Sequence, residues 1–410
     1  MNLANYIFYI LLFVGFFLPT NSNMYIPLPG VLLKVNELAF LLLPVINLFC
    51  KSNIAKHKID NKLRKNIFFI LITVLITEFV LKPFLFGQSV GDSFKSFRIG
   101  LPLFASLLIL YQGIRVNVRT FWKVLLFAIG ISVLLSVLSI FIYLPIYYKA
   151  DEENVLNMLQ GRIVNSNGSF GIIGLYLLFA DKEKWYNEGK LVKIVSVLSV
   201  IALILTFNRT YLALLALELL YLTYKSFSLN TLKRLVVLTT MFLAVISYSY
   251  YNFGMIRRQM DKRILSIINS EVSIHESTIK GNRDMIYEGI RLRIDENYWL
   301  IGLPYKIPIF IRPSMYGKES QELRKTDTSI INVLLRYGVI PLILITLVFN
   351  LLIKRDKNYG FKTVFIIYLL ASLNTDSLVG QNAIFFLILF FIIRNSFINE
   401  KNSFYSQNRS

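Results

Sequence analysis

The sequence is poor in charged residues and contains almost no cysteine. Asp, Glu, Lys and Arg make up 17% of the 410 residues, whereas a soluble domain carries about a quarter. Hydrophobic residues account for 55%, and the mean hydropathy is +0.57. Cys50 is the single cysteine, which excludes a disulfide framework. The scarcity of charge indicates a chain that folds in lipid and excludes an ordinary soluble globule.

Motifs of soluble enzymes are also missing. The sequence contains no P-loop, no G-x-G-x-x-G, no H-E-x-x-H and no G-x-S-x-G. Its two histidines, His57 and His275, fall in segments predicted on opposite sides of the membrane, and the sequence has no compact Asp/Glu cluster. We therefore expect neither a bound metal nor a cofactor. Most of the net charge of +20 lies in gaps between apolar runs, where it sets topology and does not indicate nucleic-acid binding.

Apolar runs long enough to cross a membrane recur along the chain. A helix needs about 20 apolar residues to span the hydrocarbon core. The runs predict an all-α polytopic membrane protein with about twelve transmembrane helices. The first run has no basic start and no A-x-A site, so we expect a retained helix. The predicted spans are 3–19, 31–50, 66–86, 97–113, 120–148, 164–180, 191–207, 209–226, 235–254, 326–353, 361–379 and 381–394.

Basic residues in the gaps orient these spans. Alternate gaps, together with the C-terminal tail, hold 23 Lys and Arg, whereas the opposite short gaps hold six. Positive residues stay in the cytoplasm, so we predict both termini inside, in the bacterial cytoplasmic membrane. The six outer basic residues are Lys82, Lys95, Arg98, Lys149, Arg162 and Arg209.

One gap is far longer than the others. Residues 255–325 form a polar, Arg-rich segment on the predicted outer side, and long loops are translocated regardless of charge. Apolar residues recur at helical spacing near 255–268 and 285–290. We therefore predict an extracytoplasmic cap with amphipathic helices, and the alternative is a passive spacer. The predicted regions are 1–254 with nine helices, the cap 255–325, 326–394 with three helices, and a cytoplasmic tail 395–410.

Three polar stretches on the predicted outer side contain arginine. A planar guanidinium can bind phosphate oxygens through paired hydrogen bonds. Snorkelling to lipid headgroups is the structural alternative. Arg209 is the best candidate for binding, because a minimal turn offers few other reasons for a charge. The stretches are 160–168 with Arg162, Asn165 and Asn167; 206–211 with Arg209; and 281–284 with Arg283, followed by Arg291 and Arg293.

Glu78, Glu218 and Arg336 are ionisable residues inside predicted spans. Such groups are costly in lipid and usually face a cavity or a partner. Arg336 lies about ten residues into its span, roughly 15 Å deep at about 1.5 Å per residue. We expect it to line a cavity or to form an ion pair. Glu218 is expected to neutralise an arginine.

At these residues the chain resembles the O-antigen polymerase and O-antigen ligase superfamily of bacterial surface-polysaccharide assembly. Four local patterns match in order between about 160 and 345. Gly161-Arg162 with Asn165 and Asn167 is similar to the family's arginine-then-asparagine stretch, and Thr206–Thr210 to its T-x-S-R turn. Gly281–Tyr287 and Trp299–Pro304 resemble the S-G-R-x-x-I-W … L-x-G-x-G run of its large loop, and Asp327–Ile331 with Tyr337-Gly338 resembles its re-entry segment.

The resemblance implies a GT-C-like architecture and a metal-independent glycosyltransferase. The implied reaction transfers a growing glycan from polyprenyl diphosphate to the terminal sugar of an incoming polyprenyl-diphosphate-linked repeat unit, outside the membrane. Implied partners are these lipid-linked oligosaccharides, membrane lipids, and a chain-length regulator and flippase of the same pathway. Arginines would stabilise the leaving diphosphate, and a base would accept the proton of the acceptor hydroxyl.

Both substrates of this reaction carry a diphosphate, so we expect two arginine subsites. Arg162 and Arg209 are assigned to one, and Arg283 with Arg291 or Arg293 to the other. The candidates for the base are, in order, Asp327, Asp284 and His275, and the candidates for lining the cavity are Arg336, Asn165 and Asn167.

The sequence departs from the ligase branch at one informative position. Ligases of this group carry a histidine before the helix that follows the large loop, where this chain has Asp327-Thr328-Ser329. This favours the polymerase branch over an O-antigen ligase. Pro304 replaces the second glycine of the family's G-x-G, so the local turn is expected to differ. A lipid-linked oligosaccharide flippase and a non-catalytic scaffold are alternatives, although the internal repeats typical of transporters are absent.

Overall fold

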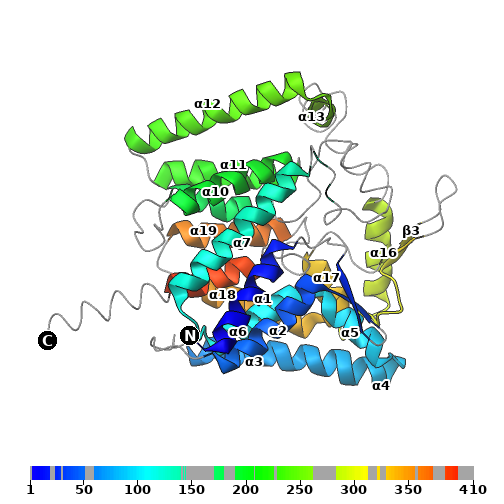
Figure 1. Ribbon diagram of the computed structural model, residues 1–410. Coiled ribbons are helices and arrows are strands. Elements are labelled where there is room, and N and C mark those ends of the chain that lie inside the picture. Colours follow the sequence, from blue (N-terminus) through cyan, green and yellow to red (C-terminus); the bar gives the residue numbers. More distant parts are fainter. Residues whose placement is uncertain are drawn as a thin grey trace.

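Helices dominate the computed structural model, which is shown in Figure 1. They take up 84% of the residues that the structure describes, which confirms the all-α class in its coarse form. The described residues are 2–18, 24–28, 31–50, 60–139, 142, 144, 170–179, 190–206, 208–225, 229–261, 283–312, 321–323, 329–355, 359–372 and 384–395.

Each predicted span coincides with one or more helices. These are α1 (Leu3–Phe17), α2 (Val35–Phe49), α3 (Asn61–Ile76), the π-helix η1 (Thr77–Leu81), α4 (Lys82–Phe86), α5 (Val90–Ile99), α6 (Leu101–Gln112), α7 (Val118–Leu138), α9 (Phe170–Phe179), α10 (Lys190–Leu205), α11 (Arg209–Lys225), α12 (Leu229–Asn252), α17 (Ser329–Tyr337), α18 (Val339–Arg355), α19 (Tyr359–Ser372) and a last helix, Ile384–Asn395. Other elements are α13 (Gly254–Met260), α16 (Arg283–Asp295), and two antiparallel hairpins, β1 (Tyr25–Leu28) with β2 (Val31–Lys34) and β3 (Phe310–Arg312) with β4 (Gln321–Leu323).

Among the described residues, two helices have the length and apolar composition needed to cross a membrane. They are Asn61–Phe86, which joins α3, η1 and α4, and Val118–Leu138, which is α7. The bent pair α5 and α6 supplies a third if it is counted as one span. Several further apolar helices are shorter, with 10 to 17 residues. These helices indicate membrane association, whereas the twelve-span topology stays a prediction.

The predictions of single helices over 97–113 and 326–353 are wrong. The first is broken at Gly100, where α5 and α6 meet at 77°, because Pro102 lies in the first turn of α6, where proline favours a new helix start. The second is broken at Gly338, which has a φ of +88° and ends α17. Hydropathy does not register the break at Gly338, because apolar residues predominate in both flanking helices.

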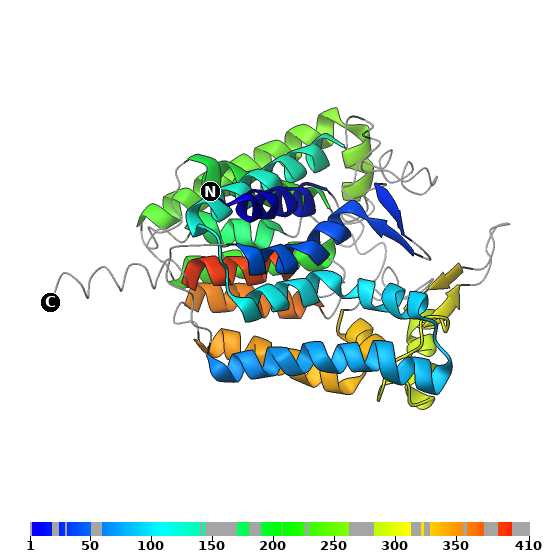
Figure 2. The same ribbon diagram turned by 60° about the horizontal axis from the view of Figure 1, so that its bottom comes forward.

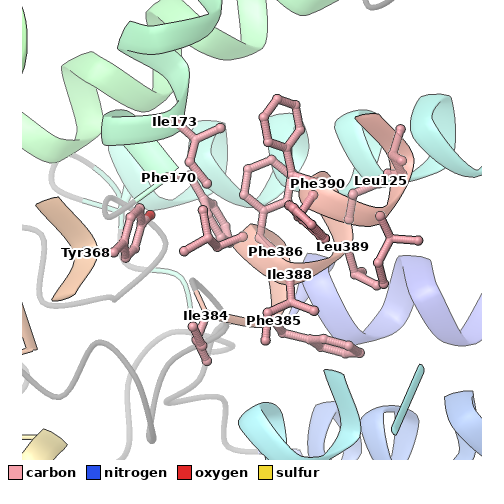
Figure 3. Packing of buried hydrophobic residues seen from close by; sticks show 14 of the residues in the cluster. Leu125, Phe170, Ile173, Tyr368, Ile384, Phe385, Phe386, Ile388, Leu389 and Phe390 are labelled. Carbon is pink, nitrogen blue, oxygen red and sulfur yellow. The ribbon is translucent and has the colours of Figure 1, made fainter. Parts of the chain in front are cut away.

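The core is built around the last helix, Ile384–Asn395, whose residues 384–393 are all buried. Figure 3 shows its side chains surrounded by residues of other helices, among them Leu125, Phe170 and Tyr368. Aromatic rings supply much of the contact. The ring of Phe385 lies 4.6 Å from that of Phe40 between centroids, within the range of favourable edge-to-face packing. A helix that is apolar and buried all round is central, although this one is short.

Hydrogen bonds join both ends of the predicted spans 31–50 and 97–113. At one end, the Nδ2 group of Asn47 donates to the carbonyl of Gly113 at 2.9 Å. At the other end, Nη1 of Arg98 donates to the carbonyl of Leu32 in the β1–β2 hairpin at 2.6 Å. Figures 1 and 2 both place this hairpin, α5 and α16 toward the right-hand end. The two spans therefore run in the same direction, and the side of the membrane on which each end lies stays a prediction.

The described parts of the long polar segment include two helices and a hairpin. Helix α13 covers the beginning of the predicted helical stretch 255–268, the rest of which lies outside the described residues, and α16 covers the stretch 285–290; β3 pairs with β4 in the register Phe310 with Leu323. A small hydrophobic cluster joins Ile290, Leu303 and Ile309 to Leu335 of α17. Residues 296–309, here called the cap segment, are therefore anchored to a helix that follows them in the chain.

Candidate functional site where the cap segment meets the helices

Several predicted site residues lie outside the described part of the chain. These are Arg162, Asn165, Asn167, His275 and Asp327. Arg209 begins α11, and Arg283 with Asp284 begins α16. The structure gives backbone positions for these last three, so the first diphosphate subsite and the base stay predictions.

The turn before α11 is held by two side-chain hydrogen bonds. Oγ1 of Thr206 accepts from the backbone N–H of Asn208 at 3.2 Å, and Oδ1 of Asn208 accepts from the N–H of Thr210 at 3.0 Å. Asn208 is therefore the N-cap of α11, a position where Asn is strongly preferred. These bonds fix the backbone of Arg209 at the first residue of the helix.

Arg291 and Arg293 of α16 have different surroundings. Arg291 is exposed, with an ion pair to Asp295 at 3.9 Å. The side chain of Arg293 is only 16% exposed; its Nε donates to the carbonyl of Pro308 at 3.2 Å and its Nη1 to Glu296 at 2.7 Å. Residues two apart on a helix do not share a face. Arg293 thus holds α16 against the cap segment, and Arg291 is the one of the two that is open to an external ligand.

Three ionisable side chains are fully buried at the junction between the helices and the cap segment. Glu78 of η1, Lys82 of α4 and Arg336 of α17 each have an exposed fraction of 0%. The ammonium of Lys82 donates to Oε1 of Glu78 and also to the backbone carbonyl of Arg336. Arg336 was expected to line a cavity or form an ion pair, and its Nη1 donates to the carbonyls of Pro304 and Ile307 at 3.3 and 3.5 Å.

The spacing of four residues brings Glu78 and Lys82 together, because residues four apart lie on one face of a helix. Glu78 lies in the π-helix η1, and Lys82 is the first residue of α4. Single π-turns inside α-helices occur frequently at functional sites. Removing one partner of such a buried ion pair costs about 3–5 kcal/mol, because the other charge is left uncompensated.

The cap segment and the end of α17 interlock through two glycines. A Cβ at Gly302, which has a φ of +96°, would overlap the carbonyl of Arg336. A Cβ at Gly338 would lie 2.5 Å from the carbonyl oxygen of Leu300. Between these points, the N–H of Leu303 donates to the carbonyl of Leu335 at 2.6 Å. The two backbones approach as closely as they do because both positions lack a side chain.

Further contacts fasten the same junction to α5. Oε1 of Gln88 accepts from the N–H of Tyr305 at 2.7 Å, and Nε2 of Gln88 donates to Ser93 at 2.9 Å. The hydroxyl of Tyr337 donates to the carbonyl of Ser96 at 3.1 Å. The cap segment therefore joins elements that are more than 200 positions apart in the sequence.

The chemical resources of the junction are cations, one carboxylate and backbone carbonyls. The two cations are held by this carboxylate and by the carbonyls of Pro304, Ile307 and Arg336, and electrostatic attraction is stronger in such a buried setting than in water. Among the described residues, no group of three or more His, Cys, Asp or Glu could hold a metal ion. The contacts of the junction fix the position of the cap segment relative to α17.

Glu218 of α11 is a second fully buried carboxyl, away from this junction. Neither of its oxygens has a hydrogen-bond partner among the described residues. It shares a helix face with the buried side chains of Leu214 and Leu222. The expected arginine partner is not found in the described part of the chain.

Lys82 is the site residue that the sequence analysis missed. Its charge counts there among the outer orientation signals, but the residue is buried and central to the junction. The available signal was its spacing of four from Glu78 inside one apolar run, which predicts a pair on one helix face. Its second partner, the carbonyl of Arg336, lies 254 positions away.

No protein-family model matches the chain, and comparisons with curated proteins and with solved structures find no match either. The resemblance to the polymerase and ligase superfamily therefore rests on the four local patterns and on their arrangement.

Proposed function

We propose that this chain is a polysaccharide repeat-unit polymerase of the cytoplasmic membrane. It would transfer a growing glycan from polyprenyl diphosphate to the terminal sugar of an incoming polyprenyl-diphosphate-linked repeat unit, at the outer face. The proposal joins the resemblance of the sequence to the geometry of the junction.

The observation that carries the proposal is the contact between two motif segments. Leu300–Pro304 resembles the family's large-loop motif, and Tyr337-Gly338 resembles its re-entry segment. The glycine of each segment accommodates the backbone of the other. This contact supports the assignment, because it gives a physical reason for glycine in both motifs.

The proposed reaction exchanges one bond at the anomeric carbon. The bond from this carbon to the diphosphate oxygen breaks, and a bond to the acceptor hydroxyl oxygen forms. The diphosphate leaves with the bonding electrons, and arginines stabilise the charge that it gains. The hydroxyl proton passes to a base, for which Asp327 is the first candidate.

A fixed junction supports such a reaction, because transfer between two large substrates depends on orientation. Arg336 holds the cap segment against α17 and Arg293 holds it against α16, while Lys82 ties α17 to α4. A cap fixed in this way would present its ligands at a constant position relative to the outer ends of the helices.

The test is an arginine scan in a strain that forms long polymer. We expect Arg162→Ala and Arg209→Ala each to reduce long-chain polymer to single repeat units, because the leaving diphosphate loses a cation. Arg119→Ala is the matched control: Arg119 is an exposed arginine at the opposite end of the bundle, and polymer length should not change. Chain length is read on gels and protein level by immunoblot. Normal polymer in both arginine variants at normal protein level would contradict the subsite assignment.

Deletion of the protein separates the proposed activity from transport. Single repeat units on the cell surface are expected, because export continues without polymerisation. Undecorated cells with lipid intermediates on the cytoplasmic face would instead indicate a flippase. Asp327→Asn should abolish polymer at unchanged expression, and unchanged chain length would remove Asp327 as the base.

A further inference from the structure

The C-terminal end of α17 lies inside the protein, where its last carbonyl groups need partners. Helix ends leave such carbonyls without intrahelical donors, and the end carries partial negative charge. The N–H of Gly338 donates to the carbonyl of Leu334 at 3.0 Å, and the N–H of Leu303 donates to that of Leu335 at 2.6 Å. The carbonyl of Arg336 accepts from the ammonium of Lys82. The carbonyls of Leu335 and Arg336 are therefore capped by residues distant in the sequence, Leu303 and Lys82.

Lys82 provides a positive charge at the C-terminal end of α17. Its ammonium lies between a carboxylate, from Glu78, and a carbonyl at the C-terminal end of a half-helix, from Arg336. Broken membrane helices use such carbonyl ends to coordinate monovalent cations. In this chain the cation is covalently part of the protein, and it is fully buried.

We propose that Lys82 is a tethered cation that caps α17 and thereby positions Arg336 and the cap segment. Lys82 is thus a positioning residue that acts through Arg336. An ammonium has three donor protons, so Lys82 can serve Glu78 and the carbonyl of Arg336 together. The carbonyl of Arg336 also faces Gly302. A shift of this carbonyl would therefore disturb the interlock between α17 and the cap segment.

The competing explanation is that Lys82 serves only to neutralise Glu78. The two explanations differ when both charges are removed together. If Lys82 and Glu78 only neutralise each other, the double variant Glu78→Gln with Lys82→Met should hardly change the opening of the cap segment, because replacing both members of a buried ion pair is often neutral. If Lys82 caps α17, the double variant still loses the cation at the helix end, and the cap segment should open more often.

Opening of the cap segment can be measured by thiol labelling of a buried position. Ile309 of the cap segment is fully buried, in a hydrophobic cluster that includes Leu335 of α17. In a Cys50→Ala chain that carries Ile309→Cys, the labelling rate is proportional to the open population when closing is fast. The matched control is the native Cys50 in a chain with Ile309 intact, because this thiol is buried at the opposite end of the bundle. The assay needs no substrate, so its outcome is independent of the proposed polymerase reaction.

We expect the double variant Lys82→Met with Glu78→Gln to raise the labelling rate at Ile309→Cys about tenfold, the effect of losing one charge-assisted hydrogen bond, with Cys50 labelling unchanged. Lys82→Met alone should label at least as fast, because it also leaves the carboxylate of Glu78 uncompensated. In Lys82→Ala, added ethylammonium should restore slow labelling by supplying the missing cation. A double variant that labels as slowly as the parent, no effect of ethylammonium, or an equal rise at Cys50 would each overturn the proposal.

Discussion

Replacing Gly302 by alanine tests whether the cap segment is held by direct backbone contact. Gly302 has a φ of +96°, and an added Cβ would overlap the carbonyl of Arg336. A non-glycine residue held in such a conformation costs about 1–3 kcal/mol. Relief of the overlap would also weaken the hydrogen bond from Leu303 to Leu335, worth about 1 kcal/mol. We therefore expect Gly302→Ala to lower the free energy of unfolding by about 2–4 kcal/mol.

Alanine substitutions at two other glycines distinguish the cost of backbone strain from the cost of steric overlap. Gly87 has a φ of +61°, and an added Cβ would meet nothing within 4 Å. Gly87→Ala should therefore cost strain alone, about 1–2 kcal/mol. Gly254 begins α13 and has neither a positive φ nor a neighbour within 4 Å. Gly254→Ala should change the free energy of unfolding by no more than about 0.5 kcal/mol.

The assay is unfolding in mixed micelles as the denaturing detergent increases. Tryptophan emission is a suitable signal, because Trp299 lies in the cap segment itself. The expected order of stability is Gly254→Ala, then Gly87→Ala, then Gly302→Ala. Equal losses in Gly87→Ala and Gly302→Ala would refute the overlap argument. Gly302→Ala as stable as Gly254→Ala would refute the proposed backbone interlock altogether.

Two further predictions concern topology and the second buried carboxyl. In a Cys50→Ala chain, Glu296→Cys should react with a membrane-impermeant maleimide added outside cells, whereas Arg119→Cys should react only after permeabilisation; the reverse pattern would invert the predicted orientation. Glu218→Leu should raise the free energy of unfolding in mixed micelles by about 1–3 kcal/mol, because it removes a buried carboxyl that has no partner among the described residues. A loss of stability in Glu218→Leu would mean that the carboxyl has a partner elsewhere in the chain.

The sequence alone determined where most of the helices lie, and it predicts which gaps share a side of the membrane. Membrane helices are encoded by local runs of apolar residues, and the charges between them alternate. Contacts of Asn47 with Gly113 and of Arg98 with Leu32 join the corresponding ends of two predicted spans, 31–50 and 97–113. Arg336 could also be singled out from sequence, because a charge within an apolar run needs a partner.

Tertiary structure decided which helix is central and which partners the buried charges have. Hydropathy cannot identify the core, because lipid and a protein interior are equally apolar; the short helix Ile384–Asn395 is therefore indistinguishable in sequence from a lipid-facing one. Nor could it assign Lys82 to the carbonyl of Arg336, 254 positions away. Hydropathy and helical spacing are local properties, whereas the partner of a buried charge is set by the packing of distant segments. The cap junction accordingly depends on the packing of α4, α17 and the cap segment, which are far apart in the sequence.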